Sequence, residues 1–430
     1  MEKQYLINGR ILNPSNQSDE IGGLIINSEG KIEASGKNVT IENLPNDAKK
    51  IDLNKKILMP GLVDMRVFVG EPGFEYKENF RTLSDAALSG GVTSVVSMPN
   101  TSPVIDNVSM VDFLKRRGRD KSKINIFPTA SLTKNLNGTE MTEFGLLKRK
   151  GIIGFTDGIK TIQDAQVMSR IMNYASQSDS LIIQHAEDTS LSESGVINEG
   201  EISTRLGLKG IPYLAEKIIV ERDLSLLEEY FCRYHISQVS SEKTVDVIKN
   251  AKGKGKIFTA GVSINNLSLN ENDIGDFKTF LKLSPPLRTE NDRLSLVQGL
   301  NDGTIDVIVS DHKPEDEESK RLTFSQAATG ASGVETLLPL ALELFHNKSL
   351  TLNKLIASLT SNPAKILGIN KGSLNIGCDA DLCILDINIP FVVTKAELKS
   401  KSKNTPIENR KLQGKVLKTY VRGHLMYESK

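Results

Sequence analysis

Side chains that could hold a metal ion or move a proton follow short apolar runs in the middle of the chain. Carboxylates and imidazoles do this work in hydrolases, because they donate lone pairs to a cation and exchange protons. The chain has only five histidines, so few imidazoles are available for a metal-rich site. The candidate positions are Asp64, Arg66, Phe68, Glu71, Asn100, Asp157, His185, Glu187, His235, Gln238, Ser284, Arg288, Asp311 and His312.

These positions need a scaffold that brings the ends of many strands together. From residue 57 onward, apolar runs of strand length alternate with amphipathic helical stretches, which predicts βα units and a parallel sheet. We expect an α/β fold with a TIM-like (β/α)8 barrel, in which functional side chains lie at the C-terminal ends of the strands. The strand candidates are residues 57–65, 92–99, 123–130, 151–157, 181–187, 234–240, 256–262, 280–286 and 306–311.

The two ends of the chain share a different pattern. Residues 1–54 and 370–430 alternate apolar and polar residues in short runs broken by Gly and Asn, which indicates small antiparallel strands. We therefore expect both ends to pair into one small β-sandwich domain, while residues 55–369 form the barrel domain. The Lys- and Ser-rich segment 395–411 is expected to be a solvated loop.

Composition and charge exclude several classes of function. The 54 Lys and Arg residues balance the 53 Asp and Glu residues, so no basic surface points to nucleic acid or to a membrane. No signal-peptide pattern or long apolar span occurs, which predicts a soluble cytoplasmic protein. The three cysteines, Cys232, Cys378 and Cys383, lack zinc-site spacing and are expected to be reduced packing residues.

Blocks along nearly the whole chain resemble the dihydroorotase family, in order and in register. They are PGLVDMRVFVGEPG (60–73), SGGVTSVVSMPNTSPVIDN (89–107), QHAEDTSLSESGVINEGEISTRLGLKGIPYLAE (184–216), YHISQVSSEKTVDVIKNAK (234–252), LSPPLRTENDR (283–293), GTIDVIVSDHKP (303–314), GASGVETLLPL (330–340), TSNPAKILG (360–368) and GCDADLCILD (377–386). The resemblance implies an amidohydrolase-type barrel and the reversible cyclisation of carbamoyl aspartate to dihydroorotate in pyrimidine biosynthesis. It also implies a metal ion, because water at pH 7 supplies almost no hydroxide unless a bound cation lowers its pKa.

The family's first metal-binding motif is replaced in this chain. The motif reads D-x-H-x-H-x-R in relatives, whereas Asp64 is followed here by Arg66, Phe68 and Gly70 at the next three positions. Arginine brings a permanent positive charge, and phenylalanine has no lone pair for a cation. The last position of the motif is an arginine in relatives, and the resemblance implies that its guanidinium binds a substrate carboxylate. Gly70 stands at that position here, so this contact is absent.

Other positions implied by the resemblance have also changed. Gln238 stands where relatives carry a metal-binding histidine, and an amide oxygen is a poor substitute for imidazole at zinc. Ser284 replaces an asparagine that contacts substrate in relatives. Asn265, Asn266 and Glu315 stand where relatives carry histidines.

Four positions keep the family's residue. His185 and Asp157 match metal ligands, although relatives often carry two adjacent aspartates at the second position, which leaves that match open by one residue. Asp311 matches a metal ligand and proton shuttle, and Asn100 matches a substrate-contacting asparagine. Without partner histidines, we expect these residues to be vestigial. Arg66 would replace the missing cation's charge and pair with a leftover carboxylate such as Asp311.

The sequence thus predicts a non-catalytic, dihydroorotase-like protein without a metal cofactor. Some relatives that lack catalytic residues associate with aspartate carbamoyltransferase, so the resemblance implies that partner, and a homo-oligomer is also expected. One alternative is an active dihydroorotase or another cyclic-amide hydrolase, with a single zinc ion on Asp157, His185 and Asp311. Another is a small-molecule sensor that uses the vacated pocket.

Overall fold

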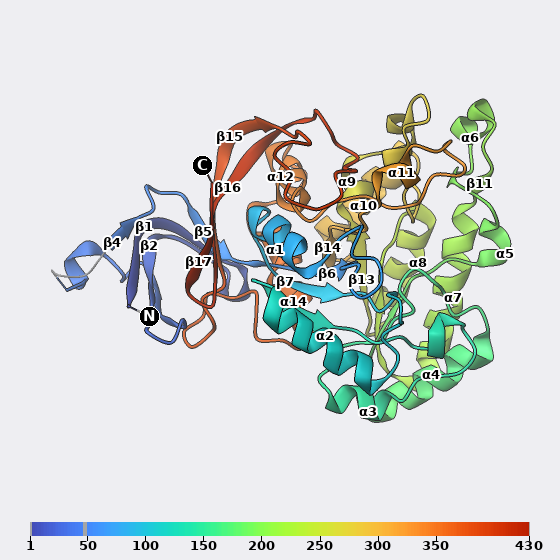
Figure 1. Cartoon of the computed structure of the whole chain (residues 1–430), viewed down its shortest axis with the longest axis horizontal. Helices are drawn as coiled ribbons and strands as arrows, with labels where there is room; N and C mark the ends of the chain where they lie inside the picture. The colour runs from blue at the N-terminus through green and yellow to red at the C-terminus, as the bar shows by residue number, and fades with distance from the viewer. Residues whose placement is uncertain (1, 46–49, 430) are drawn as a thin grey trace.

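The computed structural model describes residues 2–45 and 50–429. Two parts lie beside each other along the long axis of the molecule, a β-sheet made from both chain ends and a barrel of strands surrounded by helices (Figure 1). Both ends of the chain lie at the sheet, so the chain leaves this part, forms the barrel and returns (Figure 1).

The barrel contains the parallel strands that the alternating pattern predicts. They are β6 (Leu62–Val67), β7 (Val92–Ser97), β8 (Asn125–Pro128), β9 (Leu181–Gln184), β12 (Arg233–Ile236), β13 (Thr259–Ser263) and β14 (Val307–Val309). Phe155 bridges Ala130 and Ile182 between β8 and β9, and Val67 bridges His312 beyond β14. These bridges close the ring, and the predicted barrel fold is confirmed.

Two of the expected barrel strands are not regular strands, and residues 151–157 contribute only the bridging residue Phe155. Within residues 280–286, the structure has the end of a 3-10 turn, η5 (Thr279–Leu281), followed by an irregular segment. Pro285 and Pro286 lack the backbone N–H donors that a strand needs in a sheet, so the apolar run cannot pair there.

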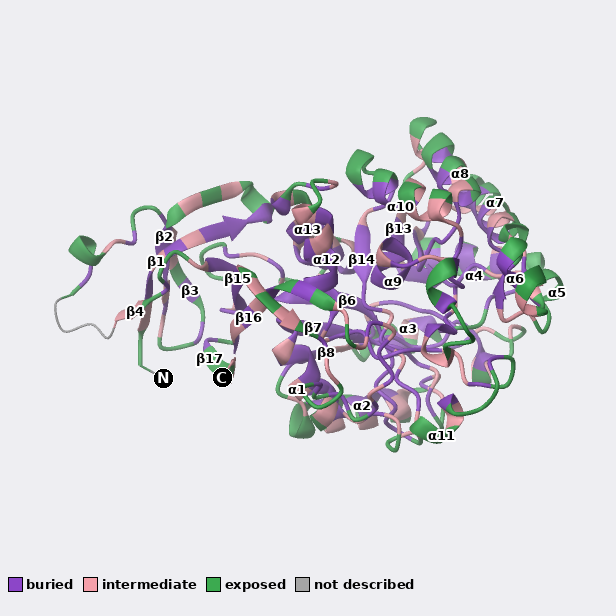
Figure 2. Ribbon diagram, turned by 90° about the horizontal axis from the view of Figure 1, so that it is seen from above, coloured by how far each residue is buried: buried purple, intermediate pink, exposed green. Residues whose placement is uncertain are grey.

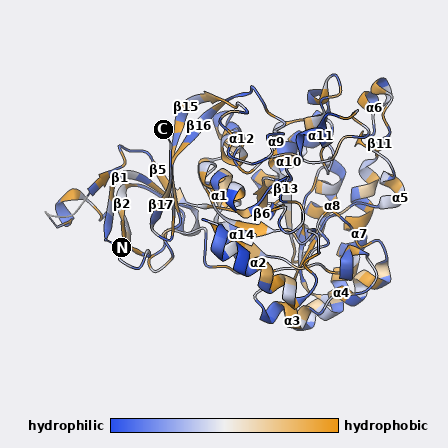
Figure 3. Ribbon diagram, viewed as in Figure 1, coloured by the Kyte–Doolittle hydropathy of each residue, from blue (hydrophilic) through white to orange (hydrophobic). Residues whose placement is uncertain are grey.

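Helices cover the outside of the barrel, with buried inner faces and exposed outer faces (Figure 2). The outer surface of α2, for example, is largely hydrophilic (Figure 3). The helices are α1 (Phe80–Ser89), α2 (Val108–Lys121), α3 (Phe144–Arg149), α4 (Ala165–Ser178), α5 (Thr189–Ser192), α6 (Glu201–Leu206), α7 (Tyr213–Tyr230), α8 (Glu242–Gly253), α9 (Ile264–Ser268), α10 (Glu290–Asp302), α11 (Glu317–Lys320), α12 (Leu337–His346), α13 (Leu352–Leu359) and α14 (Ser361–Leu367). Smaller elements are the strands β10 (Ile197–Asn198) and β11 (Gly210–Ile211) and the 3-10 turns η1 (Pro14–Asn16), η2 (Ile41–Asn43), η3 (Lys134–Leu136) and η4 (Glu271–Ile274).

The two chain ends pair with each other, as expected of the small β-sandwich, and their strands form one eight-stranded sheet. β5 lies between β1 and β15 and therefore joins the N-terminal strands to the C-terminal strands. Domain boundaries after residues 54 and 369 stay a prediction. The strands are β1 (Gln4–Asn13), β2 (Ser18–Ile26), β3 (Ile32–Gly36), β4 (Lys50–Asp52), β5 (Ile57–Pro60), β15 (Leu382–Val392), β16 (Lys411–Val421) and β17 (His424–Glu428).

The segment 395–411 is packed against the barrel and is not the solvated loop that its composition predicts. Ser400 and Asn404 are buried. The Asn404 side chain accepts a hydrogen bond from the Glu315 N–H and donates one to the Gly330 carbonyl, while the Ser400 hydroxyl donates to Glu78. These partners are distant in sequence, so composition alone could not reveal them.

Two other expectations concern cysteines and membranes. Cys232, Cys378 and Cys383 are buried and free of disulfides, as expected. Of the helices in the described ranges, none is long and apolar enough to cross a membrane.

Candidate functional site

The candidate site lies where β6, β9, β12 and β14 end, at the C-terminal mouth of the barrel. A parallel barrel brings these ends together, so residues far apart in the sequence meet there. A small cavity of about 200 Å³ opens at this mouth. The charged and polar side chains along it are Glu187, Lys282, Ser284, Asp311, Lys313 and Thr329.

Arg66 is the central cation of the mouth. It lies on β6, and its Nε donates to Asp311 Oδ1 at 3.0 Å. Its Nη1 donates to Ser237 Oγ at 2.8 Å and to the Gly158 carbonyl at 3.4 Å. The side chains of Arg66 and Asp311 are 5% and 12% exposed, so water screens this ion pair only weakly. The expected pairing of Arg66 with a leftover carboxylate is present in the structure.

Phe68 and Gly70 follow Arg66 and contribute no ligand atoms. Phe68 is buried, its N–H donates to the His312 carbonyl, and its ring lies 5.9 Å from that of Phe74. Gly70 has φ +80°, and a Cβ built there would lie 2.4 Å from the Glu78 carbonyl oxygen. This backbone therefore cannot accept a larger residue at position 70 without moving.

His185 faces Glu187 and Ser284 rather than a group of ligands. Its Nε2 lies 3.5 Å from Glu187 Oε2 and 3.5 Å from Ser284 Oγ. Burial raises the pKa of Glu187. The hydrogen bond and charge of His185, together with a hydrogen bond from Ser192, lower it by more, so the pKa lies below its ordinary value. The pair is arranged as a histidine beside an ionised carboxylate.

Gln238 and His235 occupy the neighbouring strand and its end. Gln238 is buried, and neither atom of its amide has a hydrogen-bond partner among the described residues. His235 Nδ1 lies 2.8 Å from Thr259 Oγ1. Burial, followed by the charges of Lys252 and Arg66, lowers the pKa of His235 to about 3, so this imidazole is neutral.

Asp157 and Asn100 both lie next to Gly158, Asp157 in sequence and Asn100 in space. Asp157 is buried and accepts hydrogen bonds from the backbone N–H and hydroxyl of Thr133, which hold its carboxylate. Burial raises the pKa of Asp157 despite these hydrogen bonds. Asn100 Oδ1 is buried, has no hydrogen-bond partner within residues 2–45 and 50–429, and lies beside Gly158.

These side chains do not fit the metal ion that the resemblance implies. In the described ranges, no group of three or more His, Cys, Asp or Glu side chains is close enough to hold a metal. Asp157 is bound to Thr133, Asp311 is bound to Arg66, and His185 pairs with Glu187. The guanidinium of Arg66 would also repel a cation placed beside Asp311.

Two charged neighbours of the mouth were missed by sequence reasoning. Lys313 Nζ donates to the Thr329 carbonyl at 2.7 Å and lies 3.7 Å from Glu315, which also pairs with Lys77 at 2.6 Å. Burial lowers the pKa of Lys313 against the opposing effects of Glu315 and Asp311. Lys313 directly follows Asp311 and His312 in the sequence, and this position could have indicated that it lies near the mouth. Lys282 was also missed, and its burial lowers its pKa.

The other histidine-related positions serve the fold. His312 Nδ1 accepts from the Gly333 N–H, and its Nε2 lies 3.6 Å from buried Glu78. Asn266 donates to the Pro286 carbonyl at 3.0 Å, and the Nδ2 of Asn265 has no partner in the part of the chain that is described. None of them therefore adds a metal ligand at the mouth.

Comparison with known protein families matches two parts of the chain. Residues 55–244 match a family described as Dihydro-orotase-like, and residues 328–427 match the Amidohydrolase family. Among curated proteins, the chain is 43% identical to the dihydroorotase of Ehrlichia canis over 98% of this chain and 94% of the relative. It is 41% identical to the dihydroorotase of Syntrophus aciditrophicus over 99% of both chains.

Solved structures with this architecture include hydantoinases and dihydropyrimidinases. The L-hydantoinase of Arthrobacter aurescens has a TM-score of 0.88 and 25% identity, over 100% of this chain and 96% of that one. The dihydropyrimidinase of Brevibacillus agri NCHU1002 has a TM-score of 0.85 and 21% identity, over 99% and 95% of the two chains. The second likeness concerns the fold alone.

Proposed function

The chain belongs to the dihydroorotase family of amidohydrolases, and we propose that it is a non-catalytic member of that family. The observation that carries this proposal is the ion pair between Arg66 and Asp311, with 3.0 Å between Nε and Oδ1. The guanidinium stands at a position where the resemblance places a metal-binding histidine. It supplies the positive charge that the neighbouring carboxylate requires, so the mouth is electrostatically balanced without a metal ion.

A barrel of this kind would act through its surfaces. By analogy with relatives that lack catalytic residues, we propose a cytoplasmic homo-oligomer that associates with aspartate carbamoyltransferase in pyrimidine biosynthesis. Comigration of the two purified proteins in size-exclusion chromatography would support the association. Separate elution at micromolar concentrations would contradict it.

An active dihydroorotase, or another cyclic-amide hydrolase, is the second candidate. The similar proteins named dihydroorotase favour it, as does the retention of Asp157, His185 and Asp311. These three residues would be the zinc ligands of that enzyme. The candidate requires Asp157 to leave Thr133 and Asp311 to leave Arg66.

The deciding experiment measures metal content by elemental mass spectrometry and dihydroorotate hydrolysis on the same purified sample, before and after adding zinc. We expect well below one metal ion per chain, no turnover, and a melting temperature that a chelator does not change. Near-stoichiometric metal with turnover would contradict the proposal. Asp311→Asn is the control, because any turnover that survives this substitution comes from a contaminant.

A further inference from the structure

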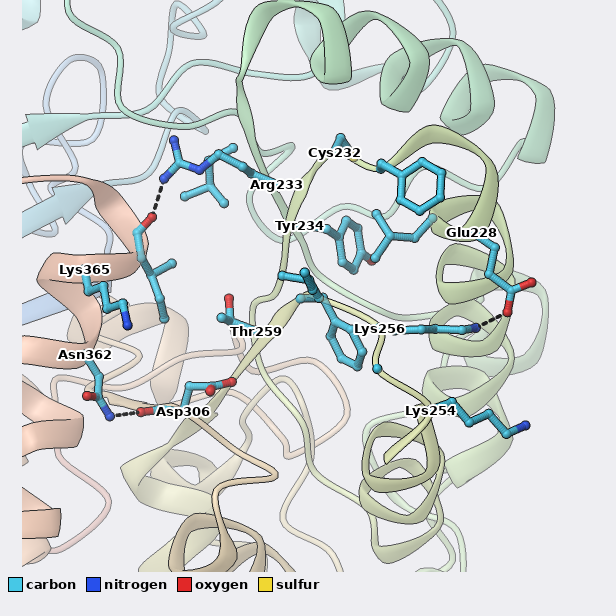
Figure 4. Close-up of a pocket in the computed structure, with 17 residues that line it drawn as sticks. Glu228, Cys232, Arg233, Tyr234, Lys254, Lys256, Thr259, Asp306, Asn362 and Lys365 are labelled. Carbon is cyan, nitrogen blue, oxygen red and sulfur yellow. Dashed lines mark hydrogen bonds and ion pairs between the residues drawn. The ribbon is translucent and has the colours of Figure 1, made fainter. Parts of the chain in front are cut away.

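A second, larger cavity opens at the end of the barrel opposite the mouth. Its volume is about 880 Å³, and its wall includes the first residues of three parallel strands, Leu181 of β9, Arg233 of β12 and Thr259 of β13. The C-terminal end of α7, residues 254–258, Asp306 and part of α14 complete the wall (Figure 4). Small-molecule sites usually occupy about 300 to 1,000 Å³, so this cavity is of that size and the mouth cavity is smaller.

The inner wall of this cavity is apolar. Leu181, Leu227, Tyr234 and Phe258 line it and are themselves buried. Cys232 also lines it, and burial raises the pKa of its thiol to about 12, so this side chain is a neutral packing group. The apolar part of a ligand could therefore pack against this wall.

Two exposed apolar side chains also line the cavity. Phe231 is 84% exposed and Ile257 is 90% exposed. Phe231 ends α7 in a left-handed backbone conformation, with φ +38°. Glycine or asparagine is the usual residue at such a helix end, because a side chain with a Cβ is disfavoured there. The exposed ring of this phenylalanine is therefore available to contact a ligand in the cavity.

The charge left unpaired at this cavity is positive. Its two carboxylates are already neutralised, since Glu228 pairs with Lys256 and Asp306 pairs with Lys252 at 2.8 Å. Lys254 and Lys365 form no ion pair within the described residues, and both are exposed. Figure 4 shows Lys365 and Arg233 on one side of the cavity and Lys254 on the other.

We propose that this cavity binds a small amphipathic anion, a molecule with an apolar body and one acidic group. The body packs on Leu227, Phe258 and the exposed Phe231, and the acidic group pairs with Lys254 or Lys365. Two copies of the chain that met through this face would bring their unpaired lysines together, so charge disfavours self-association here. The site lies away from the barrel mouth and does not depend on the proposed function.

The test is isothermal titration calorimetry of the full chain with dodecanoate below its critical micelle concentration. Dodecyltrimethylammonium, which has the same apolar chain and the opposite charge, is the matched probe. We expect one dodecanoate site per chain and binding of the cationic probe that is weaker by about tenfold or more. The double variant Lys254→Glu, Lys365→Glu should lose about tenfold in dodecanoate affinity, while Lys121→Glu on α2 should not.

A further variant tests the apolar contact. Phe231→Ser lies on the surface, so the chain should fold, and dodecanoate binding should weaken because the apolar cover is gone. The proposal is overturned if dodecanoate does not bind, if both probes bind equally, or if the double lysine variant binds as tightly as the unchanged chain. None of these outcomes alters the metal and turnover assay at the mouth, so the two proposals fail separately.

Discussion

At the scale of single residues, the barrel mouth is organised by charge. Arg66 contacts Asp311, Ser237 and the Gly158 carbonyl. It thereby links β6 to the segments that follow β14, β12 and the bridging residue Phe155. Asp311 adopts φ +51°, a backbone conformation that is uncommon for a residue with a side chain. The ion pair with Arg66 holds this aspartate in place, and the two residues act as one unit.

Arg66→Ala should destabilise the protein by about 3 kcal/mol, because it leaves the weakly hydrated Asp311 carboxylate without its partner. Urea unfolding measures the change. The double variant Arg66→Ala, Asp311→Asn should recover part of the loss, since the uncompensated charge is then absent. Arg116→Ala, at an exposed position on α2, is the control, and an equal effect of the two single substitutions would refute the role of the ion pair.

The protonation of His235 should affect stability in acid. Its pKa is about 3 in the folded protein and about 6.5 when unfolded. Because the folded pKa is lower, its contribution is present above pH 6.5 and is lost as the pH falls from 6.5 toward 3, by an amount on the order of 5 kcal/mol. His235→Gln should flatten the unfolding free energy over this pH range. If exposed His424→Gln flattens it equally, burial of His235 is not the cause.

At the scale of elements, loops and caps decide where the mouth residues lie. The N-cap Asn79 accepts hydrogen bonds from the Arg81 and Thr82 N–H groups and so sets the start of α1. The segment 395–411 binds the loop after β14 through Asn404, which contacts the Glu315 N–H and the Gly330 carbonyl. A segment with the composition of a linker therefore holds the loop after β14 in place through these hydrogen bonds.

Asn404→Ala should weaken the packing of the segment 395–411 against the loop after β14. The substitution leaves buried backbone groups unpaired and should cost about 2 kcal/mol. Trypsin should then cut among Lys395, Lys399, Lys401 and Lys403 faster than in the unchanged chain, as mass spectrometry of the fragments would show. Asn38→Ala, at an exposed position in the turn after β3, is the control substitution. Equal cleavage rates for both variants would mean that the segment is not held by Asn404.

At the scale of the whole molecule, the terminal sheet joins the two ends of the chain. β5 pairs with β15 on one side and with β1 on the other. The residues that pack this sheet come from both ends and include Leu6, Leu58, Leu382 and Tyr420. Neither chain end has a complete core without the other, so the sheet requires both ends of the chain.

A chain that stops at residue 369 should fail to fold. It loses β15, β16 and β17, exposes the edge of β5, and leaves apolar residues such as Leu58 uncovered, which favours aggregation. Solubility, circular dichroism and thermal unfolding measure the outcome. A chain that stops at residue 428 is the control. Cooperative unfolding of the shorter chain as a soluble monomer would contradict the prediction.

The sequence by itself determined the fold class and the types of residue that stand at the mouth. Apolar periodicity is a local property, so it predicted the parallel strands, and residue type alone showed that Arg66 and Phe68 donate no lone pair to a metal. Local patterns also misled, as in the strand expected at residues 280–286, where the paired prolines outweigh the apolar run.

Only the tertiary structure decided which of these residues meet. The Arg66 and Asp311 side chains are 245 positions apart, and their contact depends on closure of the barrel. Closure also turns Asp157 toward Thr133, docks the segment 395–411, and gathers Phe231, Lys254 and Lys365 around one cavity. Such contacts join strand ends and loops from distant parts of the chain, and no pattern within one segment encodes them.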